Sequence, residues 1–165
     1  MFAHTAFVGV GSNLGQKQDN CLRGITELTS NGHSRLLNCS RLYRTEPVDY
    51  LDQDWFVNCV ARIETCLDAF ELLAVLQDIQ KKAGRIHDAI RFGPRILDMD
   101  VIFFDASIID HPELTLPHPR MHLRRFVLKP LCDLDPGLRH PILGQTVQYL
   151  LDNLDDAGQG IKELS

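Results

Sequence analysis

The sequence predicts an α+β fold of the ferredoxin-like βαββαβ plan, with helices packed on a mostly antiparallel sheet. One observation is the order of periodic segments: residues 5–104 alternate as strand, helix, strand, strand, helix, strand. The other is composition, since 165 residues with 44% hydrophobic content suit one globular domain over residues 1–165. We expect a C-terminal helical extension beyond this core.

The first part of the chain alternates in the order strand, helix, strand. Residues 5–10 are short and apolar, which favours a strand, and residues 16–30 carry apolar side chains at helical spacing. Between them lies Gly9–Gly15, which we interpret as a turn with Ser12 or Asn13 as helix cap. It lacks both the lysine of a phosphate loop and the glycine spacing of a dinucleotide fingerprint. Residues 36–43 are predicted to form the second strand, before a polar loop over residues 44–54.

Residues 55–64 give the clearest strand pattern. One face is apolar, and the other carries Phe56 and Asn58 two residues apart. An aromatic ring and an amide so placed can stack on and hydrogen-bond a flat heterocycle. The alternative is a surface aromatic beside an amide that is satisfied within the protein.

The second half begins with a helix over residues 68–83, in which Asp68 and Glu71 resemble a capping box and Gly84 supplies the stop. A basic loop over residues 85–95 leads into a strand over residues 97–104. Further helices are expected around residues 126–131 and 147–154, and the last ten residues are expected to fray.

Two aspartates stand at the start of that last strand. Asp98 and Asp100 are spaced i, i+2 and therefore share one face. Paired carboxylates with arginines just upstream suit Mg²⁺ carrying substrate phosphates. The alternatives are that the aspartates cap the strand end and that the arginines form a solvated face.

Charge and cysteine usage restrict the class of protein. The net charge of −5 argues against a nucleic-acid binder, yet six of the twelve arginines lie between Arg85 and Arg125. This local basic patch suggests a small anionic ligand. The five cysteines show no CxxC spacing, and no signal peptide or membrane span is apparent, so we expect a cytoplasmic protein without disulfides.

The chain resembles the 6-hydroxymethyl-7,8-dihydropterin pyrophosphokinases of folate biosynthesis. Four motifs in the right order carry the resemblance and cover most of residues 7–136. They are Gly9-Val10-Gly11-Ser12-Asn13-Leu14-Gly15; Tyr43-Arg44-Thr45-Glu46-Pro47-Val48 with Asp52-Gln53 and Phe56-Val57-Asn58; Gly84-Arg85 through Phe92-Gly93-Pro94-Arg95-Ile96-Leu97-Asp98-Met99-Asp100; and Leu114 through Pro117-His118-Pro119-Arg120-Met121 to Arg124-Arg125-Phe126.

The resemblance implies transfer of pyrophosphate from ATP to a reduced pterin, with release of AMP. It implies that Asp98 and Asp100 hold two Mg²⁺ ions and act in catalysis together with Arg85 and Arg95. The ATP site would be formed by Gln77, Arg85, His87, Phe92, Arg95, His118 and Arg124. The pterin site would be formed by Thr45, Pro47, Val48, Phe56, Asn58 and Phe126.

The sequence departs from the family pattern at a few positions. Phe92 stands where tryptophan or tyrosine is common, His87 where a second loop arginine often lies, and Gln80 where glutamate is frequent. Asp49 and Asp54 occupy loop positions often held by glycine and proline. Two other functions stay open, a different Mg²⁺-dependent nucleotide transferase or hydrolase and a ferredoxin-like binding domain without catalysis. We expect a monomer that binds small molecules, without nucleic-acid or membrane partners.

Overall fold

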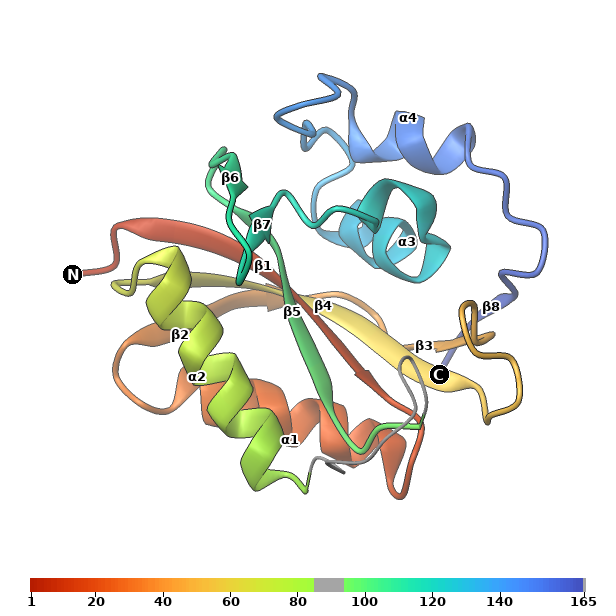
Figure 1. The fold of residues 1–165 in the computed structure, drawn as a ribbon, viewed down its shortest axis with the longest axis horizontal. Helices are drawn as coiled ribbons and strands as arrows, with labels where there is room; N and C mark the ends of the chain where they lie inside the picture. The colour runs from red at the N-terminus through yellow and green to blue at the C-terminus, as the bar shows by residue number, and fades with distance from the viewer. Residues whose placement is uncertain (85–93, 165) are drawn as a thin grey trace.

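A computed structural model describes residues 1–84 and 94–164 of the chain. Its centre is a six-stranded sheet of order β5-β1-β4-β3-β8, in which β2 also pairs with β4 (Figure 1). The pairings of β1 with β4 and β5, and of β4 with β2 and β3, are antiparallel. The strands are β1 (His4–Ser12), β2 (Ser34–Cys39), β3 (Tyr43–Thr45), β4 (Phe56–Thr65), β5 (Asp98–Phe104) and β8 (Ile161–Glu163).

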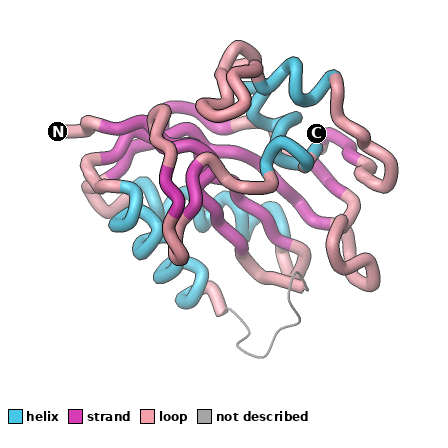
Figure 2. Tube along the Cα trace, turned by 45° about the horizontal axis from the view of Figure 1, so that its top comes forward, coloured by secondary structure: helices cyan, strands magenta, loops and turns pink. Residues whose placement is uncertain are grey.

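Helices cover both faces of this sheet (Figures 1 and 2). On one face, α1 (Lys17–Thr29) and α2 (Ala69–Lys82) pack on a core that includes Val8, Ile63 and Leu76. On the other face, α3 (Arg125–Leu134) and α4 (Val147–Asp152) pack on a second cluster. The remaining elements are the short pair β6 (Ile109–Asp110) and β7 (Thr115–Leu116), and the 3₁₀ turn η1 (Met121–Leu123).

The predicted character of β4 and α2 is confirmed. Val57, Cys59, Ala61 and Ile63 face the core beneath α1 and α2, whereas Val60 belongs to the second cluster. Asp68 accepts the backbone N–H of Glu71 at 2.8 Å, and the Glu71 side chain accepts the N–H of Asp68, which completes the capping box. Gly84 follows the helix with a φ of +98°, a conformation that glycine adopts without strain.

The single strand predicted over residues 36–43 is wrong, because the chain forms β2 and β3 with a break between them. Ser40 lies in the break, where its N–H donates to the Val60 carbonyl and its side-chain oxygen accepts the Val60 N–H. A side chain thus replaces a backbone partner and interrupts the regular ladder. The break lets β3 pair with the part of β4 that carries Asn58.

The prediction that Ser12 or Asn13 caps the first helix is also wrong. The residue at the N-cap of α1 is Gln16, and no side chain caps the helix there. Strand β1 continues to Ser12, so Gly9 and Gly11 belong to the sheet rather than to a turn. Pairing on both sides, with β4 and with β5, extends the strand through these glycines.

The frayed C-terminus expected from the sequence is contradicted by β8, which pairs with β3. The preceding residues are also anchored, since the Gly160 N–H donates to the Glu46 carboxylate at 3.0 Å and the Gly160 carbonyl accepts the Glu46 N–H at 2.9 Å. These contacts span more than 110 positions and leave no local sequence signal. The C-terminal segment therefore supports the start of the 46–55 loop.

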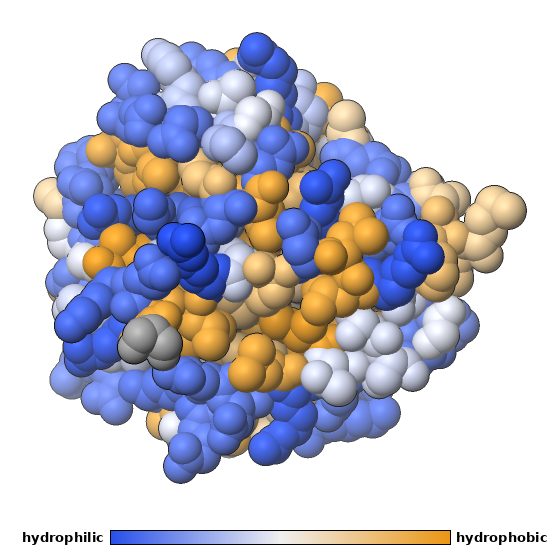
Figure 3. Space-filling view, turned by 180° about the vertical axis from the view of Figure 1, so that it is seen from behind, coloured by the Kyte–Doolittle hydropathy of each residue, from blue (hydrophilic) through white to orange (hydrophobic). Residues whose placement is uncertain are grey.

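Among the described residues, none of the helices combines the length and apolar character required to cross a membrane. On the face seen in Figure 3, apolar surface gathers near the middle and is interrupted by hydrophilic residues. Monomers and interfaces both carry patches of this kind, so the predicted monomer stays a prediction.

Candidate active site

The candidate site lies on the sheet face that β1, β4 and β5 present toward α3. In the antiparallel registers, Gly11 is opposite both Asp98 of β5 and Asn58 of β4, and Gly9 is opposite Asp100. Directly opposed residues point to the same face of a sheet. The aspartates and Asn58 therefore stand on either side of a floor made by two glycines, which place no side chain between them.

Gly11 leaves room that Asn58 requires. A Cβ atom at Gly11 would collide with Oδ1 of Asn58, and one at Gly9 would lie 3.2 Å from the flexible end of the Ile102 side chain. The glycine-rich segment thus has a packing role on the floor of the site. This role follows from its place in a strand rather than from a turn.

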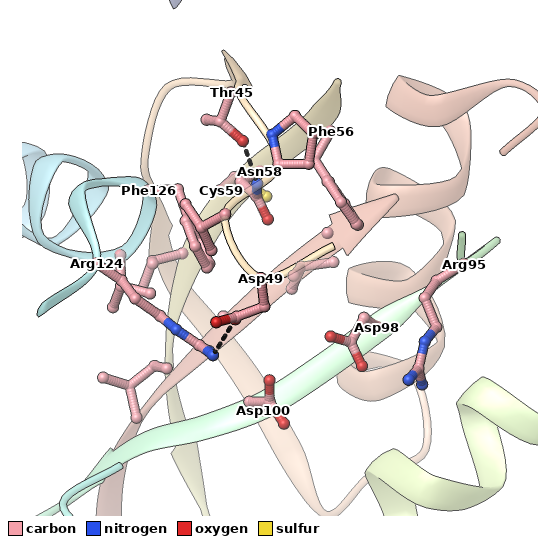
Figure 4. Close-up of a pocket in the computed structure, with 18 of the residues that line it drawn as sticks. Thr45, Asp49, Phe56, Asn58, Cys59, Arg95, Asp98, Asp100, Arg124 and Phe126 are labelled. Carbon is pink, nitrogen blue, oxygen red and sulfur yellow. Dashed lines mark hydrogen bonds and ion pairs between the residues drawn. The ribbon is translucent and has the colours of Figure 1, made fainter. Parts of the chain in front are cut away.

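The half of the pocket around Asn58 is neutral and held by hydrogen bonds. Nδ2 of Asn58 donates to the Thr45 hydroxyl at 2.7 Å, and both side chains are buried. Phe56 and Phe126 lie on either side of Asn58 (Figure 4). Two aromatic faces with an amide and a hydroxyl between them can accept a flat, polar-edged ring.

Tyr43 connects this half to α3. Its side chain is 2% exposed, and its hydroxyl donates to Asp133 at 2.6 Å. Burial and the adjacent Asp133 carboxylate raise the pKa of Tyr43, so the phenol stays protonated as a donor. Strand β3, which carries Thr45, is therefore fixed to the helix whose first turn carries Phe126.

The other half of the pocket is charged. Asp98 and Asp100 extend from β5 into the pocket beside Arg95 (Figure 4). Among the described residues, no group of three or more His, Cys, Asp or Glu side chains is placed to hold a metal ion. Mg²⁺ is usually bound through one or two carboxylates completed by substrate phosphates and water. The Asp98–Asp100 pair fits such an ion.

His118 lies next to β5, where its backbone N–H donates to the Ile102 carbonyl at 3.0 Å. Burial, with Arg124 and Arg120 nearby, lowers the pKa of His118 to about 4. Its Nδ1 accepts the Arg120 N–H at 3.2 Å, which places the proton of the neutral ring on Nε2. Near pH 7 the His118 side chain is therefore a neutral hydrogen-bond donor.

Asn13 joins the two halves. Its side-chain oxygen accepts the Arg95 N–H at 2.7 Å, and its Nδ2 donates to the Gln53 side chain at 2.8 Å and to the Asp54 carbonyl at 3.1 Å. The Asn13 N–H also donates to the Arg95 carbonyl. This residue is 1% exposed. It fixes the chain just before β5 to the 46–55 loop.

Most of the predicted site residues meet in one open pocket. Those that line it are Thr45, Pro47, Val48, Phe56, Asn58, Arg95, Asp98, Asp100, His118, Arg124 and Phe126. Gln77 is exposed on α2 and does not line it. The predictions for Arg85, His87 and Phe92 lie outside the described residues.

Sequence reasoning missed several residues of the site. Gly9, Gly11, Asp49 and Gln53 also line the pocket. The i, i+2 spacing of the two glycines in an apolar strand was the available signal for the floor.

Gln80 is buried on α2, and its Nε2 donates to the carbonyls of Leu76 and Met99. Met99 is the residue between the two aspartates, so Gln80 connects α2 to the backbone that carries them.

Comparison with known proteins gives relatives that match most of this chain. A curated 2-amino-4-hydroxy-6-hydroxymethyldihydropteridine pyrophosphokinase of Pseudomonas aeruginosa is 40% identical over 135 residues, covering 82% of this chain and 83% of that protein. The "Folic acid synthesis protein fol1" of Schizosaccharomyces pombe is 37% identical over 153 residues, covering 93% of this chain and 21% of that protein. The chain thus spans about a fifth of the length of this fungal relative.

A solved structure supports the fold. The Plasmodium falciparum HPPK-DHPS wild type with pteroate superposes with a TM-score of 0.72 at 16% identity, over 92% of this chain and 42% of that one. The family model of 7,8-dihydro-6-hydroxymethylpterin-pyrophosphokinase (HPPK) matches residues 7–136, which include both halves of the pocket. The chain belongs to the 7,8-dihydro-6-hydroxymethylpterin-pyrophosphokinase family.

Proposed function

We propose that this chain transfers pyrophosphate from ATP to the hydroxymethyl group of 6-hydroxymethyl-7,8-dihydropterin and releases AMP. The observation that carries the proposal is the row Asp98, Gly11, Asn58 across three paired strands. It brings a carboxylate suited to Mg²⁺-phosphate and an amide suited to a heterocycle onto one face. Family membership over most of the chain supports the same reaction.

The pterin would occupy the neutral half. Phe56 and Phe126 would enclose its ring, while Asn58 and Thr45 would hydrogen-bond its polar edge. Pro47 and Val48 line the same half and would contribute backbone groups and shape. Because Asn58 is already held by Thr45 and Gly11 leaves it room, little ordering would accompany binding.

ATP would occupy the charged half. Asp98 and Asp100 would hold two Mg²⁺ ions, and Arg95 and Arg124 would contact the phosphates through their guanidinium groups. His118 would add a neutral N–H donor. When bound, Mg²⁺ would supply positive charge to the phosphates and lower the pKa of the attacking hydroxyl. Arg85, His87 and Phe92 belong to the same proposal but lie outside the described residues. Gln77 does not line the pocket, so ATP would contact it only by extending beyond the pocket.

In the reaction, the pterin hydroxyl oxygen bonds to the β-phosphorus of ATP. The bond from that phosphorus to the oxygen bridging the α-phosphate breaks, AMP departs, and the hydroxyl proton passes to solvent. Negative charge spreads over the phosphoryl oxygens, so positioned guanidinium groups and hydrogen-bond donors supply much of the stabilisation. We assign no protein base.

Several finer statements belong to this proposal. The strand order β5-β1-β4-β2 with α1 and α2 on one face supports a ferredoxin-like core, to which α3 and α4 add a C-terminal extension. We further propose that residues 1–165 act as one domain, as a monomer, in the cytoplasm. Size-exclusion chromatography with light scattering tests the oligomeric state.

The direct test incubates the chain with ATP and 6-hydroxymethyl-7,8-dihydropterin, with and without Mg²⁺, and follows AMP. We expect AMP and pyrophosphorylated pterin in equal amounts, only when both Mg²⁺ and pterin are present. Formation of ADP or phosphate would instead indicate the alternative phosphotransferase or hydrolase. Ligand binding without any nucleotide product would indicate a binding domain.

A further inference from the structure

Asp49 and Arg124 form an ion pair inside the pocket. Nη2 of Arg124 lies 3.2 Å from Oδ2 of Asp49 (Figure 4). Asp49 belongs to the loop between β3 and β4, and Arg124 is the N-cap residue of α3. We propose that Asp49 occupies the guanidinium of Arg124 in place of a phosphate, and thereby sets the affinity of the site for polyphosphate. This inference rests on the proposed function.

The surroundings of Arg124 favour exchange of one anion for another. Its side chain is 14% exposed, and its guanidinium carbon lies 5.4 Å from the centre of the Phe126 ring. The ring packs against the guanidinium, while Asp49, whose side chain is 39% exposed, pairs with Nη2. A guanidinium fork fits carboxylate and phosphate oxygens in the same geometry. A phosphate binding to Arg124 therefore competes with Asp49.

The charge of the pocket strengthens this competition. Asp49 shares the lining with Asp98 and Asp100, whereas the arginines among the described lining residues are Arg95 and Arg124. Mg²⁺ would neutralise the negative charge of the β5 carboxylates. Asp49 lies instead on the loop between β3 and β4, where it forms an ion pair with Arg124. Removing the Asp49 charge therefore both releases Arg124 and reduces repulsion of a polyphosphate.

Asp54 offers a matched control on the same loop. Its carboxylate is 82% exposed, lies 3.9 Å from Nζ of Lys17, and is not part of the pocket lining. Asp54→Asn removes the same charge from the same loop but leaves Arg124 paired. Any effect of net charge alone on nucleotide binding would appear equally in Asp49→Asn and Asp54→Asn.

The test measures binding of Mg²⁺-ATP by calorimetry without pterin, so that no acceptor is present for transfer. We expect Asp49→Asn to bind Mg²⁺-ATP about fivefold more tightly than the parent, because ATP no longer has to break a partly exposed ion pair, and such pairs contribute little free energy. Asp54→Asn should stay within about twofold. In an Arg124→Gln background, Asp49→Asn should gain less than about twofold, because the guanidinium it would release is gone. Asp49→Ser should agree with Asp49→Asn, which guards against a folding defect in one variant.

Equal affinities of Asp49→Asn and Asp54→Asn would overturn the inference, as would weaker ATP binding by Asp49→Asn. If Asp49→Asn shows no gain for ATP and a separate titration shows weaker pterin binding, the inference is overturned and Asp49 is assigned to the acceptor. If the parent releases AMP while these results occur, the proposed function stands and only the inference fails. If the parent binds no ATP, both fail.

Discussion

The two halves of the pocket differ in how far the protein fixes them before any ligand binds. Around Asn58, buried side chains are already hydrogen-bonded: Asn58 donates to Thr45, and Tyr43 donates to the exposed Asp133 carboxylate of α3. Around Asp98, charged groups converge, and one of the arginines there is held by Asp49. A rigid acceptor site and a charged site that exchanges partners suit a reaction in which ATP brings its own metal.

The largest effect should follow from removing a carboxylate of the charged half. Asp98→Ala or Asp100→Ala should lower AMP release by at least about 100-fold, since electrostatic stabilisation of the phosphates is lost. Thermal unfolding should be nearly unchanged, because both side chains are only half buried. Turnover close to that of the parent in either variant would remove the aspartates from the mechanism.

A second prediction tests how rigidly the neutral half is built. Gly11→Ala should weaken pterin binding by about 10-fold or more, because the new methyl group displaces the Asn58 amide from its place. Gly9→Ala is the matched control, since the tightest contact of its methyl group is with the flexible end of Ile102 and Asn58 is not among its nearest neighbours. Pterin titrations of both variants check this. Equal losses in the two variants would mean that the loss does not come from displacement of Asn58.

A third prediction concerns the link between the halves. Asn13→Ala should lower kcat/KM for both substrates by roughly 10-fold, because it frees the Arg95 backbone and the Gln53–Asp54 loop together. Asn20→Ala is the control, as the Asn20 side-chain amide donates to the Ser12 hydroxyl and the Leu14 carbonyl, both in the nearby segment between β1 and α1. Steady-state kinetics with each substrate varied decides the matter, and a loss restricted to one substrate would contradict a shared role.

The smallest effect should come from Gln80. Replacing it by Met keeps the volume but removes the donor to the Met99 carbonyl, so we expect about 1 kcal/mol less stability toward urea. AMP release should change little, because the β1 pairing still holds β5. A large loss of turnover with unchanged stability would instead give Gln80 a direct role in placing the aspartates.

Strand periodicity predicted the neutral half well. The alternation over residues 55–64 separates core-facing from pocket-facing side chains, and the structure keeps that separation in β4. The i, i+2 spacing likewise placed Asp98 and Asp100 on one face of β5. Local alternation is sufficient for both, because a strand's faces are fixed by its own backbone geometry.

Pairings between distant segments could not be predicted in the same way. The break at Ser40, the continuation of β1 through Gly11 and the pairing of β8 with β3 each depend on a partner strand. The ion pair between Asp49 and Arg124 joins residues 75 positions apart. Sequence patterns identify the faces of single elements, whereas these contacts arise only when the sheet assembles.

The most direct test of the division into two halves is a crossed binding measurement. Asn58→Ala and Asp98→Ala are each titrated by calorimetry with pterin alone and with Mg²⁺-ATP alone. We predict that Asn58→Ala loses pterin affinity and keeps ATP affinity, and that Asp98→Ala does the reverse. Similar losses of both ligands in both variants would contradict the division and indicate a single, mutually dependent site.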